Sequence, residues 1–256
     1  MDQEIPEPSA RLQAFFETPL GRAVLSSLIQ YFHASIEGIE HIPKTGPALV
    51  VSNHALFALD TAVFGALVVR DVGRHPRFLA DRMLWTIPGF RQVITSIGAL
   101  PGEPQTAEEL LRRGELVVVY PGGVDDSLKL SHERYRLKWK QRAGFARVAM
   151  ASRAPIIPVV GFGIDEMYTV LGHEPFVGRR MFGSERYDLP VAFGAFGTFI
   201  PRRAKQTFRV LPPIETSGDP TNPADVERVR RATWDALAPH LEEARRSRDG
   251  LPTGPV

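Results

Sequence analysis

The sequence predicts a single layered α/β domain with a central, mostly parallel sheet flanked by helices. Two observations carry this prediction. Short apolar, β-branched runs alternate with helical patterns along the chain, and polar or glycine-rich clusters follow three of the runs. Alternation of this kind is typical of layered α/β folds, in which ligands bind beyond the carboxyl ends of the strands. A chain of 256 residues is long enough to build one such domain around a substantial core.

The apolar runs are too short for helices and rich in β-branched residues, so we expect buried strands at 48–52, 78–80, 116–120, 156–160 and 208–210. Helical spacing predicts helices at 55–70, 106–113, 142–152 and 222–246. The last helix has Asn222 as a possible cap and Pro223 in its first turn. Pro155 and Pro158 around one apolar run indicate an edge strand or a strongly constrained one.

We divide the chain into an N-terminal amphipathic helical segment (1–34), the main domain (35–249) and a flexible tail (250–256). Apolar residues recur at near-helical spacing over 9–32, with Pro19 and Gly21 as an expected kink. This helix would either lie on a membrane surface or pack on the core. The stretch 169–200 lacks a clear period, so we expect an irregular insertion that forms part of a binding pocket.

Composition excludes several kinds of site. The chain has no cysteine, which rules out disulfides, thiolate metal ligands and a cysteine nucleophile. The seven histidines show no pair at helical metal-ligand spacing, so no bound metal or other bound cofactor is expected. The first residues do not resemble a signal peptide, and the apolar stretch 55–69 is too short to span a bilayer, so a cytoplasmic location is expected.

The charge is unevenly distributed although the net charge is only +2. Between residues 129 and 153, Glu133 is the one acid among eight basic residues: Lys129, Arg134, Arg136, Lys138, Lys140, Arg142, Arg147 and Arg153. Such an excess indicates an anionic partner, for which nucleic acid, an anionic membrane and the phosphates of coenzyme A are all candidates. The alternative is a solvated helix face without a partner.

The first candidate for chemistry is the strand end Ser52-Asn53-His54, followed by Asp60 in an apolar helix. A buried carboxylate needs a donor, and the imidazole of His54 is the nearest one. A carboxylate on one ring nitrogen leaves the other free to act as a general base. Five residues separate the pair, so an ideal helix would not bring them together and the turn after His54 must be non-helical. The alternative is a core histidine satisfied by a neighbouring acid.

The second candidate is the loop Pro121-Gly122-Gly123, which follows a buried strand. Its glycine N–H groups are predicted to face a developing oxyanion, and Asp125 or Asp126 to orient an acceptor hydroxyl. A plain turn is the alternative. A third cluster, Gly161-Phe162-Gly163, also follows a strand. No Gly-x-Ser-x-Gly elbow, phosphate-binding Gly-Lys-Ser/Thr loop or complete dinucleotide fingerprint occurs.

Taken in this order, the Asn53-His54…Asp60 motif, the Pro121-Gly122-Gly123 loop and the strand Pro155-Ile156-Ile157-Pro158-Val159 resemble the glycerolipid acyltransferase superfamily. The similarity is closest to the neutral-lipid branch, with the type-2 diacylglycerol acyltransferases and phytyl ester synthases. Further stretches similar to that branch are 38–43, 98–102 and 142–147, and the resemblance covers about residues 35 to 215.

This resemblance implies an acyltransferase that moves a fatty acyl group from acyl-coenzyme A, or from an acyl carrier protein, to a lipid hydroxyl. His54 and Asp60 would be catalytic. Lys129, Arg134 and Arg142 would bind the donor or lipid headgroups. The phosphate-binding arginine of glycerol-phosphate enzymes has no counterpart near residues 100–104, and Gly122 stands where those enzymes carry glutamate. Both departures favour a neutral lipid or long-chain alcohol as acceptor.

The resemblance also implies peripheral association with the inner face of a membrane, and no nucleic-acid partner. The N-terminal helix and the loop 83–90 are the candidates for membrane contact, since both carry large apolar residues. Three alternatives remain open: a lysophospholipid or glycerol-phosphate acyltransferase, a thioesterase or lipid hydrolase using the same pair, and a lipid-binding protein without turnover.

Overall fold

In a computed structural model, which describes residues 16, 18–81, 99–174 and 189–250, the predicted α/β architecture is confirmed. A seven-stranded sheet has the order β1-β9-β6-β2-β5-β3-β4, and only the β6–β9 pairing among these strands is antiparallel. The strands are β1 (Ser35–Glu37), β2 (Ala48–Ser52), β3 (Arg77–Ala80), β4 (Leu100–Pro101), β5 (Leu116–Val119), β6 (Ile156–Phe162) and β9 (Thr207–Val210). A separate antiparallel hairpin joins β7 (Thr169–Glu174) and β8 (Leu189–Phe193).

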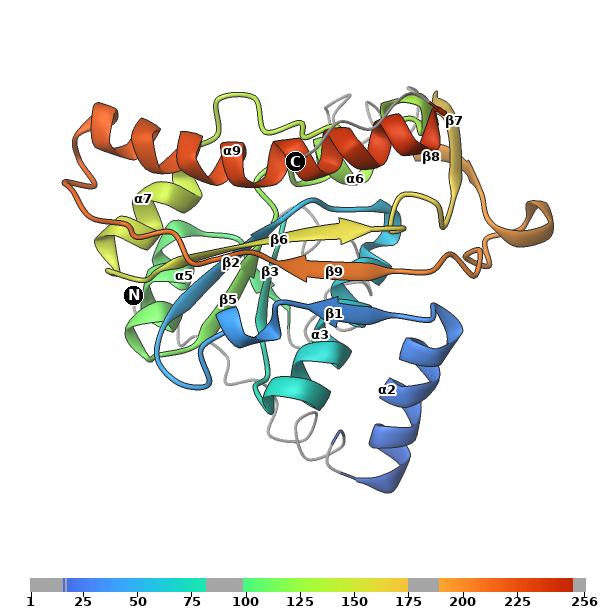
Figure 1. The fold of residues 1–256 in the computed structure, drawn as a ribbon, viewed down its shortest axis with the longest axis horizontal. Coiled ribbons are helices and arrows are strands. Elements are labelled where there is room, and N and C mark those ends of the chain that lie inside the picture. Colours follow the sequence, from blue (N-terminus) through green and yellow to red (C-terminus); the bar gives the residue numbers. More distant parts are fainter. Residues whose placement is uncertain (1–15, 17, 82–98, 175–188, 251–256) are drawn as a thin grey trace.

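Helices cover both faces of the sheet (Figure 1). One face packs against α2 (Pro19–Tyr31) and α3 (Leu59–Val72), and the other against α5 (Pro104–Arg112), α7 (Gly144–Ala151) and α9 (Pro223–Arg248). Successive residues of β2 alternate between the two cores, because side chains on a strand point to opposite faces. Ala48 and Val50 enter the core under α3, while Leu49 and Val51 enter the core under α5 and α9. Burial on both faces explains why the central strands are continuous apolar runs.

The interpretation of the proline-rich strand as an edge strand is wrong, because β6 lies between β2 and β9. Pro158 pairs with Val51 of β2, and its carbonyl accepts a hydrogen bond from Leu211 N at 2.9 Å. An N–H group at position 158 would point toward β9, on the same side as the Pro158 carbonyl, at a place just beyond Val210, the last residue of β9. The sheet therefore loses a single ladder bond and tolerates the proline.

The stretch 169–200 is more regular than predicted, since it contains β7 and β8. The predicted kink at Pro19 and Gly21 falls at the start of α2: Phe16 is helical, Thr18 has an extended backbone, and α2 begins at Pro19, so Gly21 lies within its first turn. Thr18 is the N-cap of α2, its Oγ1 accepting from Gly21 N at 3.0 Å, and Pro19 occupies the first turn, where proline is tolerated. Residues 1–15 and the loop 83–90 lie outside the described residues. Within the part of the chain that the structure describes, no helix is long and apolar enough to cross a membrane.

Candidate active site

The three polar clusters predicted from the sequence come together at one end of the sheet. They follow β6, β2 and β5, which are adjacent and parallel. Asn53, buried at the end of β2, holds two of these ends together. Its Nδ2 donates to Gly161 O at 2.9 Å and its Oδ1 accepts from Gly161 N at 2.8 Å. This reciprocal pair satisfies the backbone of β6 where the sheet opens toward the site.

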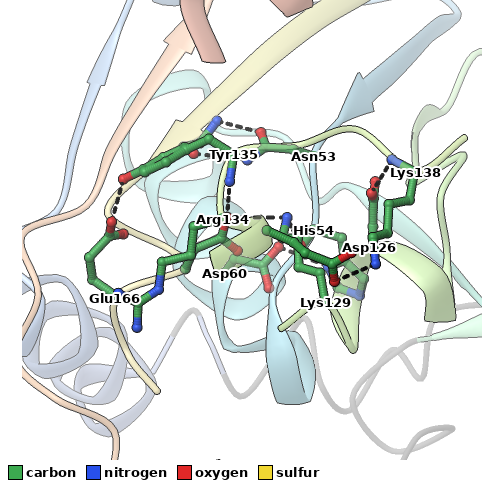
Figure 2. Close-up of polar contacts among 12 residues, drawn as sticks. Asn53, His54, Asp60, Asp126, Lys129, Arg134, Tyr135, Lys138 and Glu166 are labelled. Atoms are coloured by element: carbon green, nitrogen blue, oxygen red, sulfur yellow. Dashed lines mark hydrogen bonds and ion pairs between the residues drawn. The ribbon is translucent and has the colours of Figure 1, made fainter. Parts of the chain in front are cut away.

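His54 follows Asn53 and meets Asp60 as predicted. Its Nδ1 lies 2.9 Å from Asp60 Oδ2, and Figure 2 shows the two side chains turned toward each other. The Asp60 side chain is 1% exposed and that of His54 is 14% exposed, so solvent reaches only the imidazole. With the Asp60 carboxylate as the acceptor, the imidazole donates from Nδ1, and Nε2 is the ring nitrogen left to accept a proton. The geometry suits a general base.

The prediction of a non-helical turn between the pair is confirmed. Residues Leu56–Ala58 form a short 3-10 turn before α3, and two of them have left-handed backbone conformations. Phe57 has φ 62° and Ala58 has φ 55°. Neither is glycine, so the turn stores about 1–2 kcal/mol of strain per residue, which the surrounding packing must hold. The turn brings Asp60, in the first turn of α3, back under His54.

Tyr120, the residue before Pro121, packs on the imidazole. The two rings are stacked with centroids 4.0 Å apart and planes 17° apart, and the Tyr120 hydroxyl accepts from Thr61 Oγ1 at 2.9 Å. Burial and the charge of Asp60 raise the pKa of Tyr120 well above its usual value, so it stays neutral. The ring therefore fixes one face of His54 without competing for its proton.

Lys129 supports His54 from behind. Its Nζ donates to the His54 carbonyl at 3.1 Å and lies 3.2 Å from Asp165 Oδ2, and both side chains of this ion pair are at most 4% exposed. Burial alone would lower the pKa of Lys129, but the charges of Asp165 and Asp126 outweigh it and raise that pKa above its usual value. The prediction that Lys129 binds a donor or headgroup is therefore wrong: its ammonium is enclosed and already paired.

The Pro121-Gly122-Gly123 loop is a tight turn, and only part of the predicted oxyanion site fits it. Gly123 N donates to Tyr120 O at 2.8 Å, so this N–H is not available to an oxyanion. That leaves the Gly122 N–H as the candidate donor. A Cβ on Gly122 would lie 2.1 Å from Asp126 Cγ, so the loop requires glycine there.

The two acids after the loop hold the protein's own groups. Asp126 is fully buried and its Oδ1 accepts from Lys138 N at 2.7 Å. Burial raises the pKa of Asp126, and the charge of Lys129 and the Lys138 bond offset only part of this. Asp125 is paired with Lys140 and Arg142; partial burial works to raise its pKa, but these partners hold it below the usual value. The carboxylate of Asp125 is therefore not free to orient an acceptor, whereas Asp126 is enclosed and its Oδ2 has no hydrogen-bond partner among the described residues.

The basic stretch is less available than its sequence suggested. Carboxylates pair with four of its eight cations, namely Lys129, Lys138, Lys140 and Arg142. Two others donate to carbonyls: Arg134 to Tyr168 O and Arg147 to Pro220 O. Arg142 also donates to Pro121 O at 3.1 Å and to Gly122 O, which fixes the glycine loop. Most of these cations therefore stabilise the fold around the site.

A small hollow opens next to the turn that joins His54 to Asp60. It is lined in part by Leu56, Lys129, Arg134, Asp165 and Tyr168. Leu56 belongs to the turn between His54 and Asp60, and neither of these two residues lines the hollow. Among the residues that the structure describes, no cluster of three acids or histidines could hold a metal ion.

Three residues near His54 are not identified from the sequence as parts of the site. The sequence assigns Tyr120 only to the strand before the glycine loop. Thr61 is a polar residue within the predicted helix 55–70, and nothing in the sequence assigns it to the site. Asp165 follows the Gly161-Phe162-Gly163 cluster by two residues, and its position after a third strand end is the available signal.

The Acyltransferase family model matches residues 33–161, which is half of the chain and includes His54, Asp60 and the glycine loop. The chain belongs to the Acyltransferase family. The predicted resemblance to the glycerolipid acyltransferase superfamily is thereby confirmed. In fold, this family member is similar to the crystal structure of the 1-acyl-sn-glycerophosphate (LPA) acyltransferase PlsC from Thermotoga maritima. The TM-score is 0.55 at 19% identity, over 90% of this chain and 85% of that one.

Two curated relatives extend the comparison. A human protein named as a DGAT1/2-independent enzyme synthesizing storage lipids is 35% identical over 161 residues, which cover 63% of this chain and 49% of that protein. An uncharacterized protein of Mycobacterium tuberculosis is 29% identical over 222 residues, covering 82% of this chain and 61% of that protein. The chain thus spans about half to three fifths of the length of these relatives.

Proposed function

We propose that this protein is an O-acyltransferase that moves a fatty acyl group from acyl-coenzyme A to the hydroxyl of a lipid acceptor. The observation that carries the proposal is the buried contact of 2.9 Å between His54 Nδ1 and Asp60 Oδ2. It lies at the carboxyl ends of parallel strands, inside the segment that the family model matches. A histidine held in this way by a carboxylate is suited to take a proton from a hydroxyl.

The proposed reaction is direct transfer without a covalent enzyme intermediate. His54 Nε2 takes the proton of the acceptor hydroxyl, and the oxygen attacks the thioester carbonyl. The tetrahedral oxyanion is stabilised by the Gly122 N–H, since Gly123 N already donates to Tyr120 O. Collapse of the intermediate forms the ester and expels the thiolate, which receives the proton from His54. Asp60 stabilises the imidazolium in between.

A neutral hydroxyl lipid or long-chain alcohol is the proposed acceptor. Gly122 stands where the glycerol-phosphate enzymes carry a glutamate, so that side chain is absent here. The nearby cations Arg142 and Lys140 are already paired with Asp125, and a phosphate headgroup would have to compete with Asp125 for these two cations. The human relative is named for storage-lipid synthesis, which agrees with a neutral acceptor. The LPA acyltransferase of the same fold is the reason to test lysophosphatidate as the second candidate.

Replacement of His54 by Ala tests the proposal. With acyl-coenzyme A and a diacylglycerol or long-chain alcohol, ester formation should fall by about 10²–10⁴-fold, the usual contribution of a general base. His132→Ala, which removes an exposed histidine of the 3-10 turn Ser131–Glu133, is the matched control and should keep full activity. Circular dichroism and thermal unfolding would establish that both variants are folded. Ester formation above about a tenth of wild type in His54→Ala would exclude the assigned base.

Product analysis separates the alternatives. Release of free fatty acid that is independent of added alcohol would indicate a thioesterase or hydrolase using the same pair. A preference for lysophosphatidate over diacylglycerol would move the acceptor to the glycerol-phosphate class. Lipid binding without turnover, equal in wild type and His54→Ala, would indicate a lipid-binding protein. Parallel reactions with acyl-coenzyme A and acyl carrier protein would identify the donor.

A further inference from the structure

Large apolar side chains are exposed in the loop between β8 and β9. Phe196 is 99% exposed, Phe199 is 76% exposed and Ile200 is 56% exposed. The preceding hairpin adds Val191 and Phe193, each about two fifths exposed. Single exposed apolar residues are ordinary, but a contiguous group marks a surface that binds a partner. We refer to residues 194–201 as the apolar loop.

Several backbone groups of the apolar loop are hydrogen-bonded within the loop. Gly194 N donates to Thr198 O at 2.6 Å, Ala195 N to Ile200 O at 2.7 Å, and Thr198 N to Ala195 O at 3.0 Å. The hydroxyl of Thr198 also donates to Ala195 O at 2.8 Å. These polar groups therefore do not depend on water, and burial of the loop in an apolar medium would not leave them unpaired.

Positive charge follows the apolar residues directly. Between residues 189 and 205 the sequence has Arg202, Arg203 and Lys205 and no acid. Arg203 and Lys205 are exposed, and the Arg203 guanidinium lies 5.5 Å from the ring centre of Tyr31. An apolar tip bordered by cations matches the lipid–water boundary of an anionic bilayer, where cations meet headgroups and apolar side chains meet acyl chains.

The apolar loop lies at the same end of the sheet as His54. Figure 1 shows the β7–β8 hairpin and the segment before β9 extending beyond the end toward which β6 points. Tyr168 connects the two regions, because its hydroxyl donates to Phe199 O at 3.0 Å and its ring packs edge-on against Phe57 at 5.2 Å. Phe57 belongs to the turn between His54 and Asp60.

We propose that the apolar loop inserts into the interface of a bilayer containing anionic phospholipid, with Arg203 and Lys205 on the headgroups. The residues of the apolar loop are not those of the two membrane contacts predicted from the sequence. The inference rests on the proposed function, since it places the end of the sheet that carries His54 against the phase that holds the lipid acceptor. A second copy of the chain or another protein is the competing occupant.

Vesicle co-sedimentation of the full chain tests the insertion. Phe196→Ser, Phe199→Ser and Ile200→Ser combined should weaken partition onto phosphatidylcholine–phosphatidylglycerol vesicles about a hundredfold. Arg203→Gln with Lys205→Gln should weaken it about thirtyfold on these vesicles, and little on pure phosphatidylcholine. The matched control is Arg112→Gln with Arg231→Gln, which removes two exposed charges from α5 and α9 and should change partition much less. Equal effects of the two charge variants would overturn the proposal.

A labelled variant reports on the loop itself. The chain has no cysteine, so Phe196→Cys accepts a single environment-sensitive dye, and Arg112→Cys on α5 is the control position. Vesicles should shift the emission to the blue at 196 and leave it unchanged at 112. No shift at 196, or a shift that follows protein concentration without vesicles, would overturn insertion and in the second case indicate self-association.

The two proposals fail separately. His54→Ala should bind vesicles as wild type does, because His54 is not part of the apolar loop. The triple serine variant should keep transfer of a short, water-soluble acyl donor to a soluble alcohol while losing transfer on vesicles. Loss of the soluble reaction in that variant would mean that the apolar loop supports the fold and would overturn its role as an anchor.

Discussion

Replacement of Lys129 by Met should be among the most destabilising changes near the site. The Lys129 and Asp165 side chains are 3% and 4% exposed, and their charged atoms lie 3.2 Å apart. At that distance, with an effective dielectric constant of about 20, the attraction is about 5 kcal/mol. Methionine would leave Asp165 buried and unpaired, so we expect the free energy of unfolding to fall by about 3–5 kcal/mol.

Urea unfolding of wild type, Lys129→Met and Lys129→Met with Asp165→Asn provides the assay. The double variant has no uncompensated charge at this pair, and the amide oxygen introduced at position 165 can still accept the hydrogen bond that Tyr135 N donates to Asp165 at 2.8 Å. It should therefore recover more than half of the loss. If the single variant has become too unstable to measure at 25 °C, the double variant should still show a cooperative transition.

A loss below about 1 kcal/mol in Lys129→Met would refute the reasoning, because that is the size expected of a solvent-exposed pair. The pH dependence gives an independent check. The folded pKa of Lys129 is raised above 10.5, so its contribution is complete below pH 10.5 and is lost only as the pH rises through the folded value. Wild type and Lys129→Met should differ by the same amount from pH 7 to pH 9.

Two further changes test the loop beneath the candidate oxyanion site. In Gly122→Ala, a Cβ 2.1 Å from Asp126 Cγ must displace the loop or the acid. The free energy of unfolding, measured in urea, should therefore fall by about 1–3 kcal/mol, and ester formation should fall as well. The matched control is Gly144→Ala, whose Cβ would meet nothing within 4 Å. Burial raises the pKa of Asp126, so this carboxyl group binds a proton more tightly in the folded than in the unfolded state. As the pH falls from 7 toward 3.8, the free energy of unfolding of wild type should therefore increase relative to that of Asp126→Asn, which lacks the group. A difference between the two proteins that does not change with pH would contradict the assignment.

The sequence predicted the central strands well because burial on both faces leaves long apolar runs. The predicted strand 48–52 coincides with β2, and the clusters that follow β2, β5 and β6 lie together at one end of the sheet, as predicted. The peripheral strands were missed for physical reasons. β1 and β4 are three and two residues long, too short to show a period, and β7 and β8 have several exposed positions.

The pair of His54 and Asp60 was predictable because a carboxylate in an apolar helix needs a donor nearby. The partners of the cations were not predictable in the same way. Lys129 has Asp125, Asp126 and Glu133 within four residues in sequence, but the carboxylate that pairs with its ammonium is that of Asp165, which follows the far end of β6. Long-range pairing of this kind depends on the register of the sheet, which charge counting along the chain does not contain.

The left-handed turn at Phe57 and Ala58 has a consequence for how this site tolerates change. The irregular backbone before α3 sets the position of Asp60 relative to His54. That position therefore does not depend on the helical repeat of about 3.6 residues. One residue could be added to or removed from such a turn while α3 stays seated on the sheet. The distance between the two side chains is therefore separable from the length of chain that joins them, and glycine in place of Ala58 would keep the same path without its steric cost.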